Sequence, residues 1–204
     1  MKILIISDTH YNYTIDDFKK YTDFDYCISL GDVERNVLLY FSDYCKNNNI
    51  PIYSIPGNHD TWNYLQDIEY IKDVHCKIFK LNNYLCYGFG GSYKYKDYNI
   101  PLYSDQESID IMKKAPKCDI LFTHDSIKIK NIFFNNKLKT FLYKNFYQIV
   151  NHPGLLGINY YLNKNKPKFH FHGHHHVNIQ YKYNKTICNC IYGLKIIEIN
   201  DKKI

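Results

Sequence analysis

The chain has 204 residues and a formal net charge of +6, and 45% of its residues are hydrophobic. This length and composition indicate one globular domain spanning residues 1–204. The sequence has no long uncharged apolar run, so we expect no membrane-spanning segment. The mild positive charge suits a phosphate-bearing partner but does not by itself establish nucleic-acid binding.

The seven cysteines favour a reducing environment. Their number is odd, and their spacing matches neither a disulfide framework nor a zinc finger. Disulfides are rare in the cytosol, where thiols stay reduced. The sequence therefore predicts a cytoplasmic protein.

The first third of the chain alternates between predicted strands and predicted helices. The strands are expected at 2–7, 26–30 and 51–55, and the helices at 15–21, 33–47 and 61–71. This alternation is typical of βαβ units in a mostly parallel sheet. Ligand groups of such sheets gather on loops beyond the carboxyl ends of the strands, where Asp8, Asp32 and Asn58 all lie.

The rest of the chain adds antiparallel signals. Asn82-Asn83 is a turn between two apolar runs, and Ser104 with Glu107 forms a helix capping box. The expected elements are a hairpin of 76–81 and 84–90, a Tyr/Lys-rich loop at 90–98, a helix at 104–114, a strand at 118–123, helices at 138–150 and 155–162, a strand at 168–172, and a hairpin of 187–192 and 195–200.

Side chains with metal-ligand chemistry follow several of these strands. Asp8 and His10 are two residues apart, which on an extended backbone turns both side chains the same way. His174 and His176 have the same spacing. A carboxylate with imidazoles suits a first-row dication. By spacing alone, His172 is as eligible as His174.

Five short blocks, in chain order, resemble the signature blocks of calcineurin-like metallophosphoesterases. They are Asp8-x-His10, Gly31-Asp32, Gly57-Asn58-His59-Asp60, Thr123-His124 and Gly173-His174-x-His176. Each block is weak alone, but five in order at strand ends form a specific signal that covers nearly the whole chain. The resemblance implies an α/β fold, a four-layer αββα sandwich of two mixed β-sheets flanked by helices, with the metal site at the C-terminal edge of the strands.

The resemblance also implies two divalent metal ions, with manganese favoured over iron, cobalt, nickel and zinc. The ligands it implies are Asp8, His10, Asp32 and His176 for the first ion, and Asp32, Asn58, His124 and His174 for the second. His59 would be the catalytic histidine near the leaving group, and Asp60 would orient its ring. His170 and His172 are then expected to be structural, and His175 to point away from the ions.

These features predict a hydrolase of phosphate esters, with phosphodiesters favoured, in which a metal-bridging hydroxide attacks phosphorus in line. A phosphoprotein phosphatase or a nuclease on the same site is the alternative. A non-catalytic scaffold that binds partner proteins is less favoured, because the chain keeps all seven ligands and His59.

Two features depart from the family pattern and leave the substrate open. Many members continue the second block as Gly-Asp-x-x-Asp, whereas here Val33-Glu34-Arg35 follows Asp32. Arg35 is therefore only a candidate phosphate clamp. The segment after His124-Asp125 is rich in lysine where small members often have proline. With the loop at 93–98 it leaves nucleic acid open as a partner, although a solvated face is favoured.

Overall fold

The computed structural model describes residues 1–10, 13–96, 98–131, 136–145 and 153–200. Its elements, in chain order, are β1 (Lys2–Ser7), α1 (Ile15–Phe18), β2 (Tyr26–Ser29), α2 (Arg35–Asn47), β3 (Ile52–Ser54), β4 (Lys72–Asp73), β5 (Ile78–Leu81), β6 (Tyr84–Phe89), β7 (Ser92–Tyr93), β8 (Leu102–Tyr103), α3 (Asp105–Lys114), β9 (Ile120–Thr123), the 3-10 helix η1 (Ile129–Asn131), α4 (Asn136–Asn145), α5 (Leu156–Asn165), β10 (Phe169–His172), β11 (Ile179–Tyr183), β12 (Thr186–Cys190) and β13 (Gly193–Glu198).

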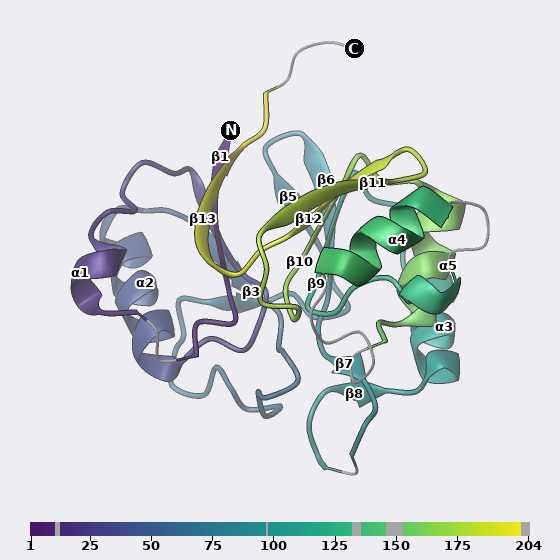
Figure 1. The fold of residues 1–204 in the computed structure, drawn as a ribbon. Helices are drawn as coiled ribbons and strands as arrows, with labels where there is room; N and C mark the ends of the chain where they lie inside the picture. Colours follow the sequence, from purple (N-terminus) through teal and green to yellow (C-terminus); the bar gives the residue numbers. More distant parts are fainter. Residues whose placement is uncertain (11–12, 97, 132–135, 146–152, 201–204) are drawn as a thin grey trace.

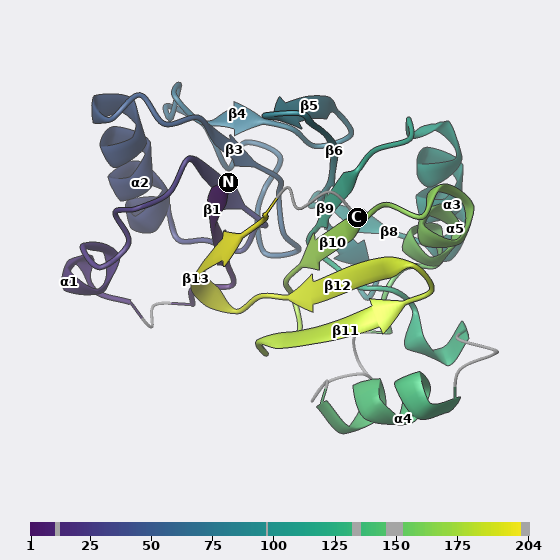
Figure 2. The same ribbon diagram turned by 90° about the horizontal axis from the view of Figure 1, so that it is seen from above.

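Two large mixed sheets pack face to face, and helices cover their outer faces (Figure 1, Figure 2). The first sheet has the order β13-β1-β2-β3-β4, and the second has the order β11-β12-β10-β9-β6-β5. The central strands of each sheet run parallel, while β13, β5 and β11 pair antiparallel at the margins. Helices α1 and α2 lie outside the first sheet, and α3 and α5 lie outside the second. The expected four-layer αββα sandwich is confirmed.

Three apolar clusters fill the spaces between these layers. Alternation along β1 shows how the sequence builds them, because successive side chains of a strand point to opposite faces. Ile3 and Ile5 join the cluster between the sheets, whereas Leu4 and Ile6 join the cluster beneath α2. The third cluster lies between the second sheet and its helices. A strand buried on both faces explains the unbroken apolar run at the N-terminus.

Several expected elements are present. The hairpin of β5 and β6 pairs antiparallel, and α3 begins with the predicted box, in which Ser104 Oγ accepts from the Glu107 N–H. Helices α2 and α5 also form where apolar periodicity predicts them. The helix expected at 138–150 is found as α4, and its last five positions lie outside the described residues. Among the described residues no helix is both long and apolar enough to cross a bilayer.

Two expectations about these elements are wrong. Residues 61–71 form successive turns instead of a helix, with hydrogen bonds of three-residue spacing, and Asp67 has a φ of 63°. The final strands do not form a hairpin with each other. Strand β12 pairs with β10 and β11, whereas β13 crosses to the other sheet and pairs with β1. Apolar alternation predicts a strand but does not identify its partner.

Candidate metal centre

The side chains predicted as metal ligands gather at the carboxyl ends of the parallel strands of both sheets. Asp8 directly follows β1, and His124 directly follows β9. Asp32 and Asn58 lie on the loops after β2 and β3, and the loop after β10 carries two of the histidines. Because the two sheets meet at this edge, residues far apart in the sequence come within hydrogen-bond distance of one another.

One group consists of Asp8, His10 and His176, whose ligand atoms all lie within 4.8 Å of one another. His10 Nε2 is 2.9 Å from His176 Nε2, and His176 Nε2 is 3.5 Å from Asp8 Oδ1. Two ring nitrogens this close either share a proton or direct both lone pairs at a cation. The group thus has the composition and spacing of a metal site.

The Asp8 carboxylate is held by one oxygen only. Its Oδ2 accepts the Ser7 hydroxyl and, at 2.8 Å, the backbone N–H of His174. Its Oδ1 is buried and has no hydrogen-bond partner among the described residues. A buried carboxylate oxygen without a partner is costly. A cation bound beside His10 and His176 would remove that cost.

A second group consists of Asp32, His124 and His174, again with ligand atoms within 4.8 Å of one another. His124 Nε2 lies 3.3 Å from Asp32 Oδ2 and 2.8 Å from Asn58 Oδ1. The other ring nitrogen of His124, Nδ1, is 2.8 Å from the Leu30 carbonyl oxygen. Since a carbonyl only accepts, Nδ1 carries the proton, and Nε2 can direct its lone pair into the group.

Electrostatics in this second group favour positive charge. Burial opposes ionisation of Asp32, but the neighbouring His124 and the His59 N–H lower the pKa of its carboxyl below the ordinary value. Burial likewise opposes protonation of His124, yet the Asp32 and Asp8 carboxylates raise the pKa of its imidazole to about 10. No lysine or arginine pairs with Asp8 or Asp32 among the described residues. A metal ion binds the neutral form of imidazole, so a cation would take the place of the proton on His124 Nε2.

The ligand side chains converge through tight turns and not through strand parity. Asp8, His10, Asp32, His174 and His176 all have φ between 40° and 69°. This left-handed conformation is uncommon for residues other than glycine. Asp8 and His10 do face one group, as their spacing predicts, although neither residue has an extended backbone. At His174 and His176 the same spacing does not bring the two side chains into one group. The backbone turns sharply instead, so that His174 faces the second group while His176 faces the first.

Two glycines allow the backbone to approach the carboxylates closely. A Cβ at Gly57 would collide with the Asp32 carboxylate, and a Cβ at Gly173 would collide with Ser7 Oγ and Asp8 Oδ2. Each glycine directly precedes a predicted ligand. The glycines of the motifs are thus explained by close packing around the ligand carboxylates.

His59 lies at the mouth of the centre. It lines a cavity of about 330 Å³ together with His10, Asp32, Val33, Glu34 and Asp60. Its ring meets the His10 ring edge-on, with centroids 6.0 Å apart, and its backbone N–H donates to Asp32 Oδ1 at 2.8 Å.

Asp60 has a different set of contacts from the one expected. In the described part of the chain, its Oδ2 accepts the backbone N–H groups of Asp32 at 2.9 Å and of Gly57 at 2.7 Å. It therefore fixes the turns that carry Asp32 and Gly57 to each other, and among the described residues it has no hydrogen bond to the His59 ring. Burial and the Asp32 carboxylate raise the pKa of Asp60 to about 6.

Arg35 is turned away from the centre. Its guanidinium lies 4.0 Å from the Asp67 carboxylate, half of its side chain is exposed, and it does not line the cavity. Glu34 takes the place nearer the site, where it accepts the Thr9 hydroxyl.

The remaining histidines of the 170–176 cluster serve the structure around the centre. His170 Nε2 is 2.8 Å from Thr123 Oγ1, and His172 Nε2 is 2.9 Å from the Tyr181 hydroxyl. His175 Nε2 is 2.7 Å from Ser126 Oγ. All three rings are buried. Spacing alone left His172 open as a ligand, but it is not a member of either ligand group.

One residue beside the centre has no precursor in the sequence motifs. The hydroxyl of Tyr95, on the loop between β7 and β8, lies 3.1 Å from Asn58 Nδ2. The Tyr/Lys-rich composition of this loop indicates exposure, and no periodicity or spacing links it to a strand end.

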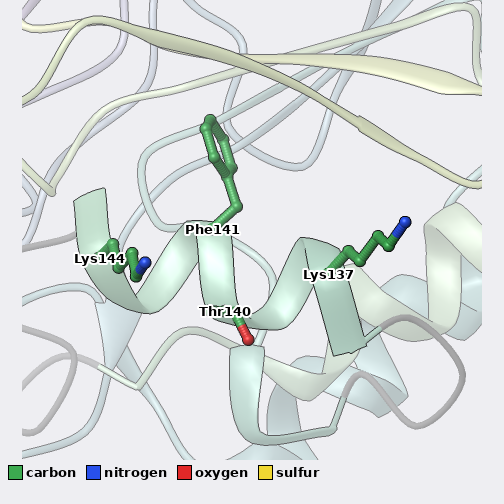
Figure 3. A pocket seen from close by; sticks show the side chains of 4 residues that line it. All are labelled: Lys137, Thr140, Phe141 and Lys144. Carbon is green, nitrogen blue, oxygen red and sulfur yellow. The ribbon is translucent and has the colours of Figure 1, made fainter.

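A separate pocket of about 430 Å³ lies along α4, lined by Lys137, Thr140, Phe141 and Lys144 (Figure 3). None of the predicted ligands lines it.

The donor set fits divalent first-row metals. It combines carboxylate oxygens, one amide oxygen and imidazole nitrogens, and it contains no thiolate. The two groups adjoin. His174 is a member of the second group, and its backbone N–H donates to the Asp8 carboxylate of the first group. The predicted ligands therefore suit two neighbouring cations.

Comparisons with known proteins agree with this geometry. A family model described as calcineurin-like phosphoesterase matches residues 1–185. No curated protein shows significant sequence similarity to the chain. Protein TT1561 of Thermus thermophilus is 15% identical, with 94% of this chain and 89% of that chain covered and a TM-score of 0.62. Phosphopantetheinyl Hydrolase (PptH) from Mycobacterium tuberculosis is 9% identical, with 100% and 98% covered and a TM-score of 0.61. At such identities the structural likeness shows a shared fold alone.

Proposed function

The chain belongs to the calcineurin-like phosphoesterase family, and on that premise we propose that it hydrolyses phosphate esters with two divalent metal ions. The observation that carries the proposal is the pair of adjoining ligand groups beside the His59 cavity. Asp8, His10 and His176 would hold one ion, and His124, His174 and Asn58 the other. Asp32 would bridge the two. Of the metals that suit these donors, manganese is the one we favour.

Divalent ions held here would lower the pKa of a coordinated water and neutralise the charge that develops on the phosphoryl oxygens. The side chains supply the remaining chemistry. His59, exposed at the mouth, would donate a proton to the departing ester oxygen. Its backbone N–H meanwhile fixes the Asp32 carboxylate, and Asp60 fixes the turns that carry Asp32 and Gly57.

The charges around the cavity favour phosphodiesters over phosphomonoesters. Among the described residues that line it, three are acidic and none is lysine or arginine. A monoester dianion would meet Glu34 and Asp60 without a compensating cation from the chain, whereas a diester carries a single negative charge. The same lining disfavours a large role for Arg35 as a phosphate clamp.

We also propose a reducing compartment, the cytoplasm, for this protein. All seven cysteines are free, and only Cys76 is exposed. Thiols in this state persist where disulfides do not form.

Metal reconstitution with a panel of substrates tests the function. The metal-free protein would receive Mn, Fe, Co, Ni, Zn or Mg singly and be assayed on bis(4-nitrophenyl) phosphate, 4-nitrophenyl phosphate, a phosphoserine peptide and single-stranded DNA. We expect hydrolysis of the diester to exceed that of the monoester, and Asp32→Asn to lose activity on both. Dominant activity on the peptide or DNA would assign the phosphatase or the nuclease alternative. No hydrolysis with any metal would leave the non-catalytic scaffold.

A further inference from the structure

The loop between β7 and β8 reaches the second ligand group through one side chain. Tyr95 is 43% exposed, yet its hydroxyl lies 3.1 Å from the Nδ2 of Asn58, which is fully buried. The contact therefore joins a surface loop to a predicted metal ligand.

The orientation of the Asn58 amide decides whether it can serve as a ligand. Only the carbonyl oxygen of an amide has a lone pair for a cation, whereas the NH2 group carries two donors. Asn58 Oδ1 lies 2.8 Å from His124 Nε2, on the side of the second group, while Nδ2 points to Tyr95. A rotation of the amide by 180° would turn its N–H groups toward the cation site. In the observed orientation the Tyr95 hydroxyl accepts from Nδ2, and this bond stabilises the amide with its oxygen toward the second group.

Tyr95 is placed by bonds at the base of its loop. The N–H of Tyr93 donates to Asp125 Oδ2 at 3.0 Å, and the N–H of Lys94 donates to the Tyr103 carbonyl at 2.9 Å. Asp125 is fully buried and directly follows His124. The base of the loop is thus tied to the same strand end that carries His124, a predicted ligand of the second group.

We propose that Tyr95 is a positioning residue that holds the Asn58 amide with its oxygen toward the second metal ion. The proposal rests on the proposed function, since it assumes that the second group binds an ion. Residues that hydrogen-bond to a metal ligand and orient it typically contribute about 10- to 100-fold to metal affinity. We therefore expect loss of the Tyr95 hydroxyl to weaken binding of the second ion by about 10-fold and to leave the first ion unaffected.

Tyr95→Phe is the sharpest variant, because it removes only the hydroxyl. The ring remains, and so does its cation–π contact with Lys96 Nζ, which lies 5.0 Å from the ring centroid. Tyr98→Phe is the matched control. Tyr98 lies on the same loop and is 69% exposed, and Lys96 Nζ makes a cation–π contact with its ring at the same distance. We expect Tyr98→Phe to bind metal like the unaltered protein.

Equilibrium dialysis against Mn²⁺, with bound metal counted by mass spectrometry, gives the readout without an activity assay. The expected result is one unchanged and one weakened ion in Tyr95→Phe, and no further loss when Tyr95→Phe is added to Asn58→Ala. Unchanged binding of both ions by Tyr95→Phe, or additive losses in the double variant, would overturn the inference while leaving the proposed function intact. An unaltered protein that binds no ion would overturn both.

Discussion

The backbone N–H of His174 donates to Asp8 Oδ2 at 2.8 Å, across a separation of 166 residues. This bond links the end of β1 in the first sheet to the turn after β10 in the second. It also links the two ligand groups, since Asp8 belongs to one and His174 to the other. The spacing of the groups is therefore set by the packing of the two sheets.

Each histidine of the last motif should control a different ion. His176→Ala removes a ligand of the first group, and His174→Ala removes a ligand of the second. We expect each variant to retain about one tightly bound ion per chain, and the double variant to retain none. Metal content after dialysis measures this. His172→Gln is the control and should keep both ions, because His172 bonds Tyr181 and joins neither group. Loss of an ion in that control would contradict the ligand assignment.

Gly173→Ala should destabilise the fold. The new methyl group would collide with Ser7 Oγ and Asp8 Oδ2, and over-packing of this kind costs about 1–3 kcal/mol. Urea denaturation of the metal-free protein measures the loss of unfolding free energy. Adding Ser7→Ala removes one of the two colliding atoms and should restore part of the stability. Gly173→Ala with unaltered stability would contradict the close approach of this turn to Asp8.

His59→Ala should separate metal binding from turnover. The variant should hold both ions, because His59 is not a member of either ligand group, while turnover falls by about 10²- to 10⁴-fold, the usual contribution of a general acid. The loss should be greater for a diester with an alkoxide leaving group than for a 4-nitrophenyl diester, since nitrophenolate departs without a proton. Equal losses on both substrates, or loss of a metal ion, would show that His59 is not the proton donor.

The sequence predicts more of the candidate site residues than of the backbone turns that bring them together. Strand-end motifs predict the candidate ligands, because each motif lies next to a buried apolar run that can be recognised in a single sequence. The left-handed turns at Asp8 and His174 are not legible, since they depend on contacts with the opposite sheet.

Other elements are hidden from the sequence for related physical reasons. The helix expected at 61–71 does not form. Successive turns place Ile68 and Ile71 in the core, so their burial does not require a continuous helix. Strand β13 shows the apolar alternation of a strand, but its partner β1 lies at the other end of the chain. Tyr95 lies on an exposed loop, and only the tertiary structure brings its hydroxyl to Asn58.

Buried His170 should make the fold sensitive to acid. Burial, and to a lesser extent the neighbouring His172, lowers the pKa of His170 well below its ordinary value of 6.5. Thr123 Oγ1 donates to the Asp125 carbonyl and so accepts from His170 Nε2, while Nδ1 has no partner among the described residues. Protonation would place an unpaired N–H in the core. The folded form stays neutral while the unfolded form gains a proton, so stability is full above pH 6.5 and falls below it.

His170→Gln tests this dependence, because glutamine keeps an N–H donor for Thr123 and does not titrate. Between pH 7.5 and pH 5.5 the unaltered protein should lose about 1.4 kcal/mol more unfolding free energy than the variant, which corresponds to one pH unit below the unfolded pKa. Urea denaturation at the two pH values measures the difference. Equal losses in the two proteins would show that the pKa of His170 is the same in the folded and unfolded states.

The central claim is that two neighbouring ions at one sheet edge hydrolyse a phosphate ester. The most direct measurement is a Mn²⁺ titration of the metal-free protein, in which bound metal and hydrolysis of bis(4-nitrophenyl) phosphate are followed on the same samples. We predict little turnover up to about one ion per chain and a rise to full turnover as the second ion binds. Full turnover with a single bound ion, or no turnover with two, would contradict the claim.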